Sequence, residues 1–289
     1  MNTGIFKEGI IMQRCKVFEA KSSTSKKKNY ENPPIPHEFE YVCGKWYSGF
    51  VIECKLDRSQ FVWIPVGFLK ANGTLDGKSF TEKFGRRLFK KEDEFSQEEF
   101  HETITEELSK QIESVKKYGG FYISRYCISR YSHSKEPMSV KGNTPLTSMD
   151  FSQAKMFAEW FDYCSEVSSH LMYGAEYDTV MEWIIESGVK TWKEVVQYSS
   201  DLGNYWNSSE AERSLAVTGS RRKWCVNNIF DLAGNVKLWT QERCGETECV
   251  LRGGSHYDDG ISHPAVKRTP VSNKYFYYGA GFRVTLCLK

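Results

Sequence analysis

The 289-residue sequence lacks the features that define several large classes of protein. It contains no apolar run of the ~18 residues that a membrane-spanning helix requires. Its first residues also lack the apolar segment of roughly 7–15 residues that a signal peptide contains. We therefore expect a chain that has no membrane span and is made in the cytoplasm, while a final location on a virion or a cell surface stays open.

Nucleotide-binding, metalloprotease and serine-hydrolase motifs are also missing. We find no GxxxxGK[ST], GxGxxG, HExxH or GxSxG pattern, and no CxxC pair that would indicate zinc. The nine cysteines are odd in number and irregularly spaced, which indicates reduced thiols. Cys244 and Cys249 flank a four-residue segment and could face each other across a hairpin, where we expect two thiols rather than a disulfide.

The sequence also lacks a large excess of charge of either sign. The 39 basic and 37 acidic residues leave a net charge of +2, and no clustered basic face is evident, so nucleic acid is not an expected partner. Aromatic residues, by contrast, make up 15% of the chain and include 16 tyrosines. Such a content suits either a surface that binds through amphipathic rings or an aromatic β-core.

The chain divides into a tail and one domain. Residues 1–35 are rich in Lys, Ser and Asn and end at a proline cluster, which predicts a tail or linker, and residues 36–289 form the domain. Residues 39–66 read as three strands, with a hairpin turn at Asp57-Arg58-Ser59. A polar insertion follows over residues 70–94.

Helical spacing and capping residues predict the helices. Ser96 and Glu99 form a capping box for a helix that ends at Gly119-Gly120, and a strand over residues 121–131 follows it. Ser148 or Asp150 caps a second helix, residues 174–185 form a third, and a box of Thr191 and Glu194 opens a short fourth one. The first helix buries Phe100, Ile104, Leu108, Ile112 and Val115; the second buries Ala154, Phe157, Trp160, Phe161 and Cys164.

Residues 227–284 show no helical period, and glycines alternate there with aromatic and β-branched residues. This pattern predicts short strands and tight loops, with a last strand over residues 282–288 paired inside a sheet. Three motifs occur in this stretch in the order GNVKLW, RGGS and GFRV. Together they resemble the formylglycine-generating-enzyme (sulfatase-modifying factor) domain, and residues 61–66, 120–126 and 145–160 extend the resemblance upstream. The resemblance implies an α+β fold of the C-type lectin type, with irregular loops and few helices.

The same resemblance argues against the enzymatic activity of that family. It implies a pair of copper-binding cysteines shortly after RGGS, because copper(I) prefers thiolates. Those places fall at Asp258 and His263, so we expect neither the oxidase nor a bound cofactor. The resemblance also implies a calcium site near Asp231, but the place of its glutamate is taken by Leu238. We expect no tight calcium there and a hydrogen-bonding role for Asp231 in its loop.

Variable proteins of diversity-generating retroelements, which include phage and bacterial surface proteins, are similar to the same domain. This similarity implies a non-enzymatic protein that binds a protein or glycan through the segment between RGGS and GFRV. Tyr supplies rigid contact area and short polar residues supply adaptable hydrogen bonds. The alternatives are an active formylglycine-generating oxidase and a structural virion protein, and the oligomeric state stays open. We assign Arg252 and Arg283 to the interior. The predicted ligand-binding residues are His256, Tyr257, Asp258, Asp259, Ile261, His263, Ser272, Asn273, Tyr275 and Tyr277.

Overall fold

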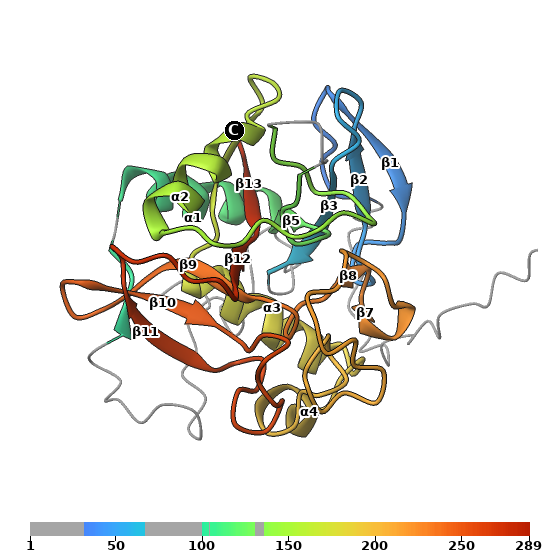
Figure 1. The fold of residues 1–289 in the computed structure, drawn as a ribbon. Coiled ribbons are helices and arrows are strands. Elements are labelled where there is room, and N and C mark those ends of the chain that lie inside the picture. Colours follow the sequence, from blue (N-terminus) through green and yellow to red (C-terminus); the bar gives the residue numbers. More distant parts are fainter. Residues whose placement is uncertain (1–31, 67–99, 104, 131–135) are drawn as a thin grey trace, which may run out of the picture.

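The computed structural model describes residues 32–66, 100–103, 105–130 and 136–289. The predicted tail up to residue 31, the polar insertion and the Ser96–Glu99 capping box lie outside these residues. Two main sheets form the framework. In Figure 1 the blue strands of one sheet and the orange strands of the other lie on opposite sides of the view, with the red β12 and β13 between them.

The larger sheet has six strands in the order β1-β2-β3-β5-β13-β6, and all its neighbours are antiparallel. Its last strand in sequence, β13, lies between β5 and β6, which confirms the predicted pairing of the C-terminal strand inside a sheet. The strands span Phe39–Cys43 (β1), Val51–Cys54 (β2), Gln60–Pro65 (β3), Gly120–Ser124 (β5), Val284–Leu288 (β13) and Val167–Leu171 (β6).

The predicted hairpin between β2 and β3 is confirmed. Its turn places Arg58 in the left-handed region with φ 67°, and the Asp57 Oδ1 atom accepts the Ser59 N–H at 2.9 Å. The strand predicted over residues 121–131 is shorter than expected, since β5 ends at Ser124 and the chain then bends.

The second sheet contains the C-terminal motifs. Its order is β11-β10-β9-β12, and β4 also pairs with β9. Strand β12 is parallel to β9, whereas the other pairs are antiparallel. A separate pair joins β7 (Cys225–Val226) to β8 (Ile229–Phe230). The sheet strands span Phe100–His101 (β4), Lys237–Cys244 (β9), Glu248–Arg252 (β10), Arg268–Ser272 (β11) and Ala280–Phe282 (β12).

Helix α1 (Glu106–Tyr118) begins later than the sequence predicts. Its N-cap is Thr105, whose hydroxyl accepts the Leu108 N–H at 3.1 Å. Phe100, predicted on the helix, instead lies in β4 opposite Cys244, because an available strand edge satisfies its backbone groups. The predicted end is confirmed, since Gly119 adopts φ 80° and its N–H bonds back to the last turn.

Helix α2 (Phe151–Ala158) continues into a 3₁₀ turn, η1 (Glu159–Phe161). Asp150 is the N-cap, one of the two predicted candidates, and accepts the Gln153 N–H at 2.8 Å. Trp160, predicted to point inward, is 55% exposed. The buried stripe runs through residues 154, 158 and 161, so position 160 falls on the neighbouring face.

Helix α3 (Gly174–Glu186) is confirmed and is buried along most of its length. The capping box of Thr191 and Glu194 is also confirmed and opens α4 (Trp192–Val196); a further 3₁₀ turn, η2, spans Arg222–Trp224. Within the described parts of the chain, none of these helices is long and apolar enough to cross a membrane.

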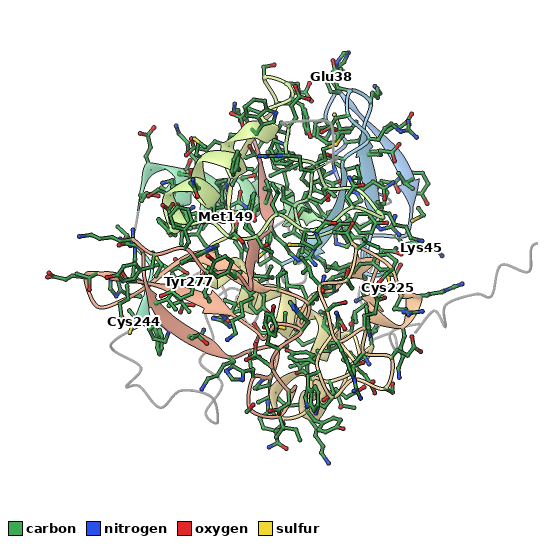
Figure 2. The ribbon with its side chains drawn as sticks, viewed as in Figure 1. Glu38, Lys45, Met149, Cys225, Cys244 and Tyr277 are labelled. Carbon is green, nitrogen blue, oxygen red and sulfur yellow. The ribbon has the colours of Figure 1, made fainter. Side chains whose placement is uncertain are left out.

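Side chains fill the space between the elements (Figure 2). Met149, just before α2, forms an isolated bridge with Tyr277, and the two are drawn side by side in Figure 2. Cys244 and Cys249 are buried and form no disulfide, as predicted. The strand register sets Cys249 opposite Arg243 rather than opposite Cys244.

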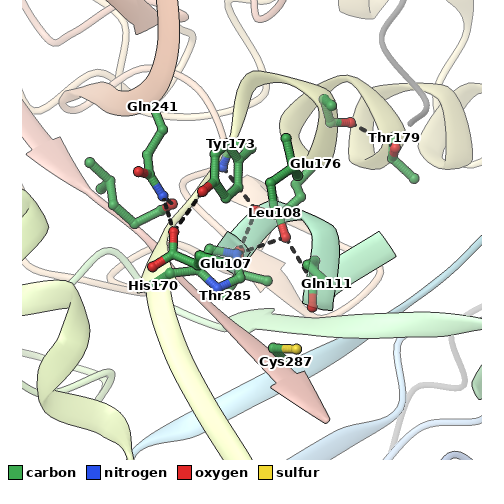
Figure 3. Close-up of polar contacts among 12 residues, drawn as sticks. Glu107, Leu108, Gln111, His170, Tyr173, Glu176, Thr179, Gln241, Thr285 and Cys287 are labelled. Carbon is green, nitrogen blue, oxygen red and sulfur yellow. Dashed lines mark hydrogen bonds and ion pairs between the residues drawn. The ribbon is translucent and has the colours of Figure 1, made fainter. Parts of the chain in front are cut away.

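A buried polar cluster joins α1, β6, α3 and β13 (Figure 3). The Glu176 carboxylate lies at its centre, 3.0 Å from His170 Nε2, and accepts hydrogen bonds from Gln111 Nε2 at 2.8 Å and Thr285 Oγ1 at 3.0 Å. Burial alone would lower the pKa of His170, but the carboxylates of Glu176 and Glu107 outweigh it and raise that pKa. The cluster therefore connects α1 and α3 to strands β6 and β13 around one buried charge pair.

Candidate ligand-binding surface

The segment between β10 and β12 forms two loops, which we name loop A (residues 253–267) and loop B (residues 273–279). Six of the ten predicted ligand-binding residues lie in loop A and three in loop B, while Ser272 is the last residue of β11. The loops meet at Tyr257. A Cβ atom built on Gly279, the last residue of loop B, would lie 3.8 Å from the Tyr257 ring. The structure thus brings the two halves of the predicted site together.

The glycines of the RGGS motif let loop A start close to the core. A Cβ atom at Gly254 would lie 2.6 Å from the Tyr205 ring and 3.0 Å from the His263 Cβ, which is too close for any larger residue. Gly253 adopts φ 70°, a conformation that other residues rarely take. The motif is therefore explained by packing and backbone conformation.

Asp258 organises loop A from within. Its Oδ2 atom accepts hydrogen bonds from the Ser255 N–H at 2.8 Å and the Ser255 hydroxyl at 2.7 Å, and lies 3.4 Å from Lys237 Nζ. Partial burial would raise the pKa of Asp258, but these contacts outweigh it and lower that pKa. The Oδ1 atom lies 3.3 Å from His263 Nδ1. Partial burial lowers the pKa of His263 in spite of this carboxylate.

Asp259 also serves its own loop, since its Oδ1 atom accepts the N–H groups of Ile261 and Ser262 at 2.9 and 2.8 Å. His256 is buried behind the loop, with its Nδ1 atom 2.9 Å from the Asn235 carbonyl oxygen. The Tyr277 ring packs edge-on against the Trp239 ring, with 5.5 Å between the ring centroids. Four predicted residues, Asp258, Asp259, His256 and Tyr277, therefore support the loops.

The outer surface of the loops carries rings and an aliphatic side chain. Tyr257 is 74% exposed, and Ile261 and Tyr275 are also exposed, as a role in binding requires. The prediction missed Phe276 and Tyr278, although Tyr278 is 80% exposed. The unbroken aromatic run from residue 275 to residue 278 was the signal in the sequence that could have identified them.

Both ends of loop A are fixed by one buried cluster of charges. Arg252 precedes the loop and Arg268 follows it, and both are fully buried. Arg252 contacts Asp178 at 2.5 Å and Glu242 at 2.9 Å; Arg268 contacts the same two carboxylates at 2.6 and 2.9 Å. The Tyr177 ring lies 4.7 Å from the Arg252 guanidinium. Two positive and two negative charges thus hold the base of loop A, and the interior role predicted for Arg252 is confirmed.

Arg283, the other arginine assigned to the interior, lies between β12 and β13. Its guanidinium donates to the carbonyl oxygens of Ser124 at 2.8 Å and Asp231 at 3.0 Å, and also to that of Phe230. It is fully buried, so the assignment is confirmed. The residue that follows β12 therefore joins the six-stranded sheet to the end of the β7–β8 pair.

Residues 50–287 match the model of the sulfatase-modifying factor enzyme 1-like domain family. The chain belongs to this family. The resemblance and the α+β fold class inferred from the sequence are thereby confirmed. No curated protein matches the chain.

Two solved structures are similar to this member of the sulfatase-modifying factor enzyme 1-like family. Treponema denticola variable protein 1 is 15% identical over 59% of this chain and 85% of that one, with a TM-score of 0.41. PvdO from Pseudomonas aeruginosa is 16% identical over 81% of this chain and 96% of that one, with a TM-score of 0.47.

The copper pair that the family resemblance implies does not fit the residues present. The sequence has no cysteine between Cys249 and Cys287, and Asp258 and His263, which the motif register predicts at the two places, contact each other at 3.3 Å. Within the described residues, no three His, Cys, Asp or Glu side chains gather as a metal site would require. We derive no copper chemistry for this chain.

The implied calcium site does not fit either. Asp231 Oδ2 accepts the Gly219 N–H at 2.9 Å, which confirms the predicted hydrogen-bonding role. Its Oδ1 atom has no hydrogen-bond partner among the described residues, and burial raises the pKa of this carboxyl to about 6. The side chain of Leu238 is buried and apolar at the place where the resemblance implies a carboxylate. A single carboxylate beside a buried leucine is a poor ligand set for calcium.

Proposed function

We propose that this chain is a non-enzymatic binding protein whose loops A and B contact a macromolecular ligand, either a protein or a glycan. The observation that supports this proposal is the exposure of Tyr257, Tyr275 and Tyr278 on loops whose ends are held by buried residues. A scaffold fixed in this way tolerates changes in the exposed side chains of its loops, since those side chains do not hold the loops in place.

The proposal includes variation of the loop sequence by a diversity-generating retroelement, in a phage, prophage or bacterial surface setting. The first test is DNA sequencing of the flanks of the gene. We expect a near-copy of the codons for residues 252–284 beside a reverse transcriptase gene, with mismatches confined to adenines of the copy. Absence of such a copy would reject diversification and leave a binding protein of fixed sequence.

The second test separates a binding surface from a structural one. Changing Tyr257, Tyr275 and Tyr278 together to Ala should move the melting temperature by less than about 2 °C, because exposed side chains contribute little to folding. A large loss of stability would show that the rings serve the fold. Size-exclusion chromatography with light scattering tests the structural-virion alternative, which requires a fixed oligomer that buries these loops between subunits.

A further inference from the structure

A third segment, residues 198–207 between α4 and η2, lies directly against loop A, and we name it loop C. The Ser199 N–H donates to the Gly260 carbonyl oxygen at 2.8 Å, and the Trp206 N–H donates to the Asp258 carbonyl oxygen at 3.0 Å. A Cβ atom at Gly260 would lie 2.3 Å from the Ser200 nitrogen. Loops A and C are therefore held together backbone to backbone. Figure 1 shows the red loop A beside α4.

Loop C brings exposed rings of its own. Trp206 is 55% exposed and Tyr198 is 46% exposed. Both rings lie at the points where loop C bonds to loop A. Trp206 itself donates to Asp258, and Tyr198 directly precedes Ser199, which donates to Gly260. The guanidinium of Arg213 lies 5.2 Å from the Trp206 ring centre. Trp, Tyr and Arg are the residue types most enriched among those that dominate binding energy between proteins.

Three side-chain acceptors of this surface are already engaged. The Asp258 and Asp259 carboxylates bond within loop A, and Asn207 Oδ1 accepts the Gly260 N–H at 3.0 Å and the Ser200 hydroxyl at 2.9 Å. These are the groups that would otherwise accept the hydroxyls of a sugar. What the three loops leave exposed is mainly aromatic and aliphatic: Tyr198, Trp206, Tyr257, Ile261, Tyr275, Phe276 and Tyr278.

We infer that Tyr198 and Trp206, which lie outside the C-terminal segment, complete the recognition surface, and that its partner is a protein rather than a glycan. This inference rests on the function proposed above. A protein supplies the apolar side chains that exposed rings bury most effectively, with the loop charges left at the rim. Loop C then provides contacts that stay constant while the residues of loops A and B change.

The experiment selects binders to the full chain from a phage-displayed library of bacterial surface-protein domains, in parallel with a printed array of bacterial glycans. The recovered clones are then titrated against Trp206→Ala and Tyr257→Ala. Trp160→Ala is the matched control, because Trp160 is equally exposed, at 55%, but lies on η1. All three variants should keep the melting temperature of the parent chain.

We expect clones whose affinity falls about tenfold or more with Trp206→Ala and with Tyr257→Ala, and not with Trp160→Ala. Clones that need Tyr257 but not Trp206 would reject the role of loop C and leave the proposed function standing. Clones insensitive to both would reject the proposed function as well. Glycans that bind at these loops, or the recovery of no protein clone, would overturn the choice of a protein partner.

Discussion

Replacing Arg252 by Met should strongly destabilise the chain, because Arg252 holds half of the positive charge in the buried cluster at the base of loop A. The variant leaves Asp178 and Glu242 facing Arg268 alone, so one buried negative charge is uncompensated. Breaking a buried charge pair by removing one partner costs about 3–5 kcal/mol. At roughly 2–4 °C per kcal/mol for a domain of this size, the melting temperature should fall by about 6–20 °C.

The assay is urea unfolding followed by tryptophan fluorescence, with thermal unfolding as a second measurement. Arg221→Met is the matched control, because Arg221 is 49% exposed and pairs with Glu212 at 3.3 Å. We expect it to cost less than about 1 kcal/mol. Adding Glu242→Gln to Arg252→Met restores the balance of buried charge, so the double variant should be more stable than the sum of the single losses predicts. A loss for Arg252→Met no larger than that of the control would refute the reasoning.

Two further predictions concern α1 and its surroundings. The raised pKa of His170 means that its pairing with Glu176 stabilises the fold fully below about pH 6.5 and that this contribution is lost as the pH rises through the folded-state pKa. His170→Gln should therefore flatten the fall in unfolding free energy as the pH rises above about 6.5, and an unchanged slope would contradict the assignment. Thr105→Ala should cost about 1 kcal/mol by removing the N-cap of α1, measured as a lower urea midpoint; an unaltered midpoint would show that Thr105 does not start the helix.

Local signals in the sequence predicted the elements that local interactions define. The hairpin at Asp57–Ser59, the Asp150 cap and α3 each follow from residues a few positions apart. The predicted start of α1 was wrong because Phe100 joins a strand instead, and its partner in that strand pair, Cys244, is remote in sequence. The burial predicted for Trp160 was wrong because a Trp next to the buried face of a helix does not have to be buried itself.

The candidate surface was likewise predicted in its local parts and missed in its remote ones. Sequence motifs located loops A and B, since the glycines of RGGS and the strand of GFRV bound them. Loop C could not be associated with them, because its hydrogen bonds to loop A either join two backbones or join a side chain, of Asn207 or Ser199, to a backbone N–H that most residue types supply. The supporting role of Asp258 was predicted from neither of its partners: Ser255 is local, at a spacing of three residues, whereas Lys237 comes from the remote strand β9.

The position of β13 has a consequence for the order of events during synthesis. Strand β5 precedes it by more than a hundred residues, and β6 also comes earlier, yet β13 lies between them and bonds to both. The six-stranded sheet therefore cannot close until the ribosome has made residues 284–288. Until then β6 has no neighbour in that sheet and one edge of β5 is unpaired, so the growing chain exposes two strand edges to other chains.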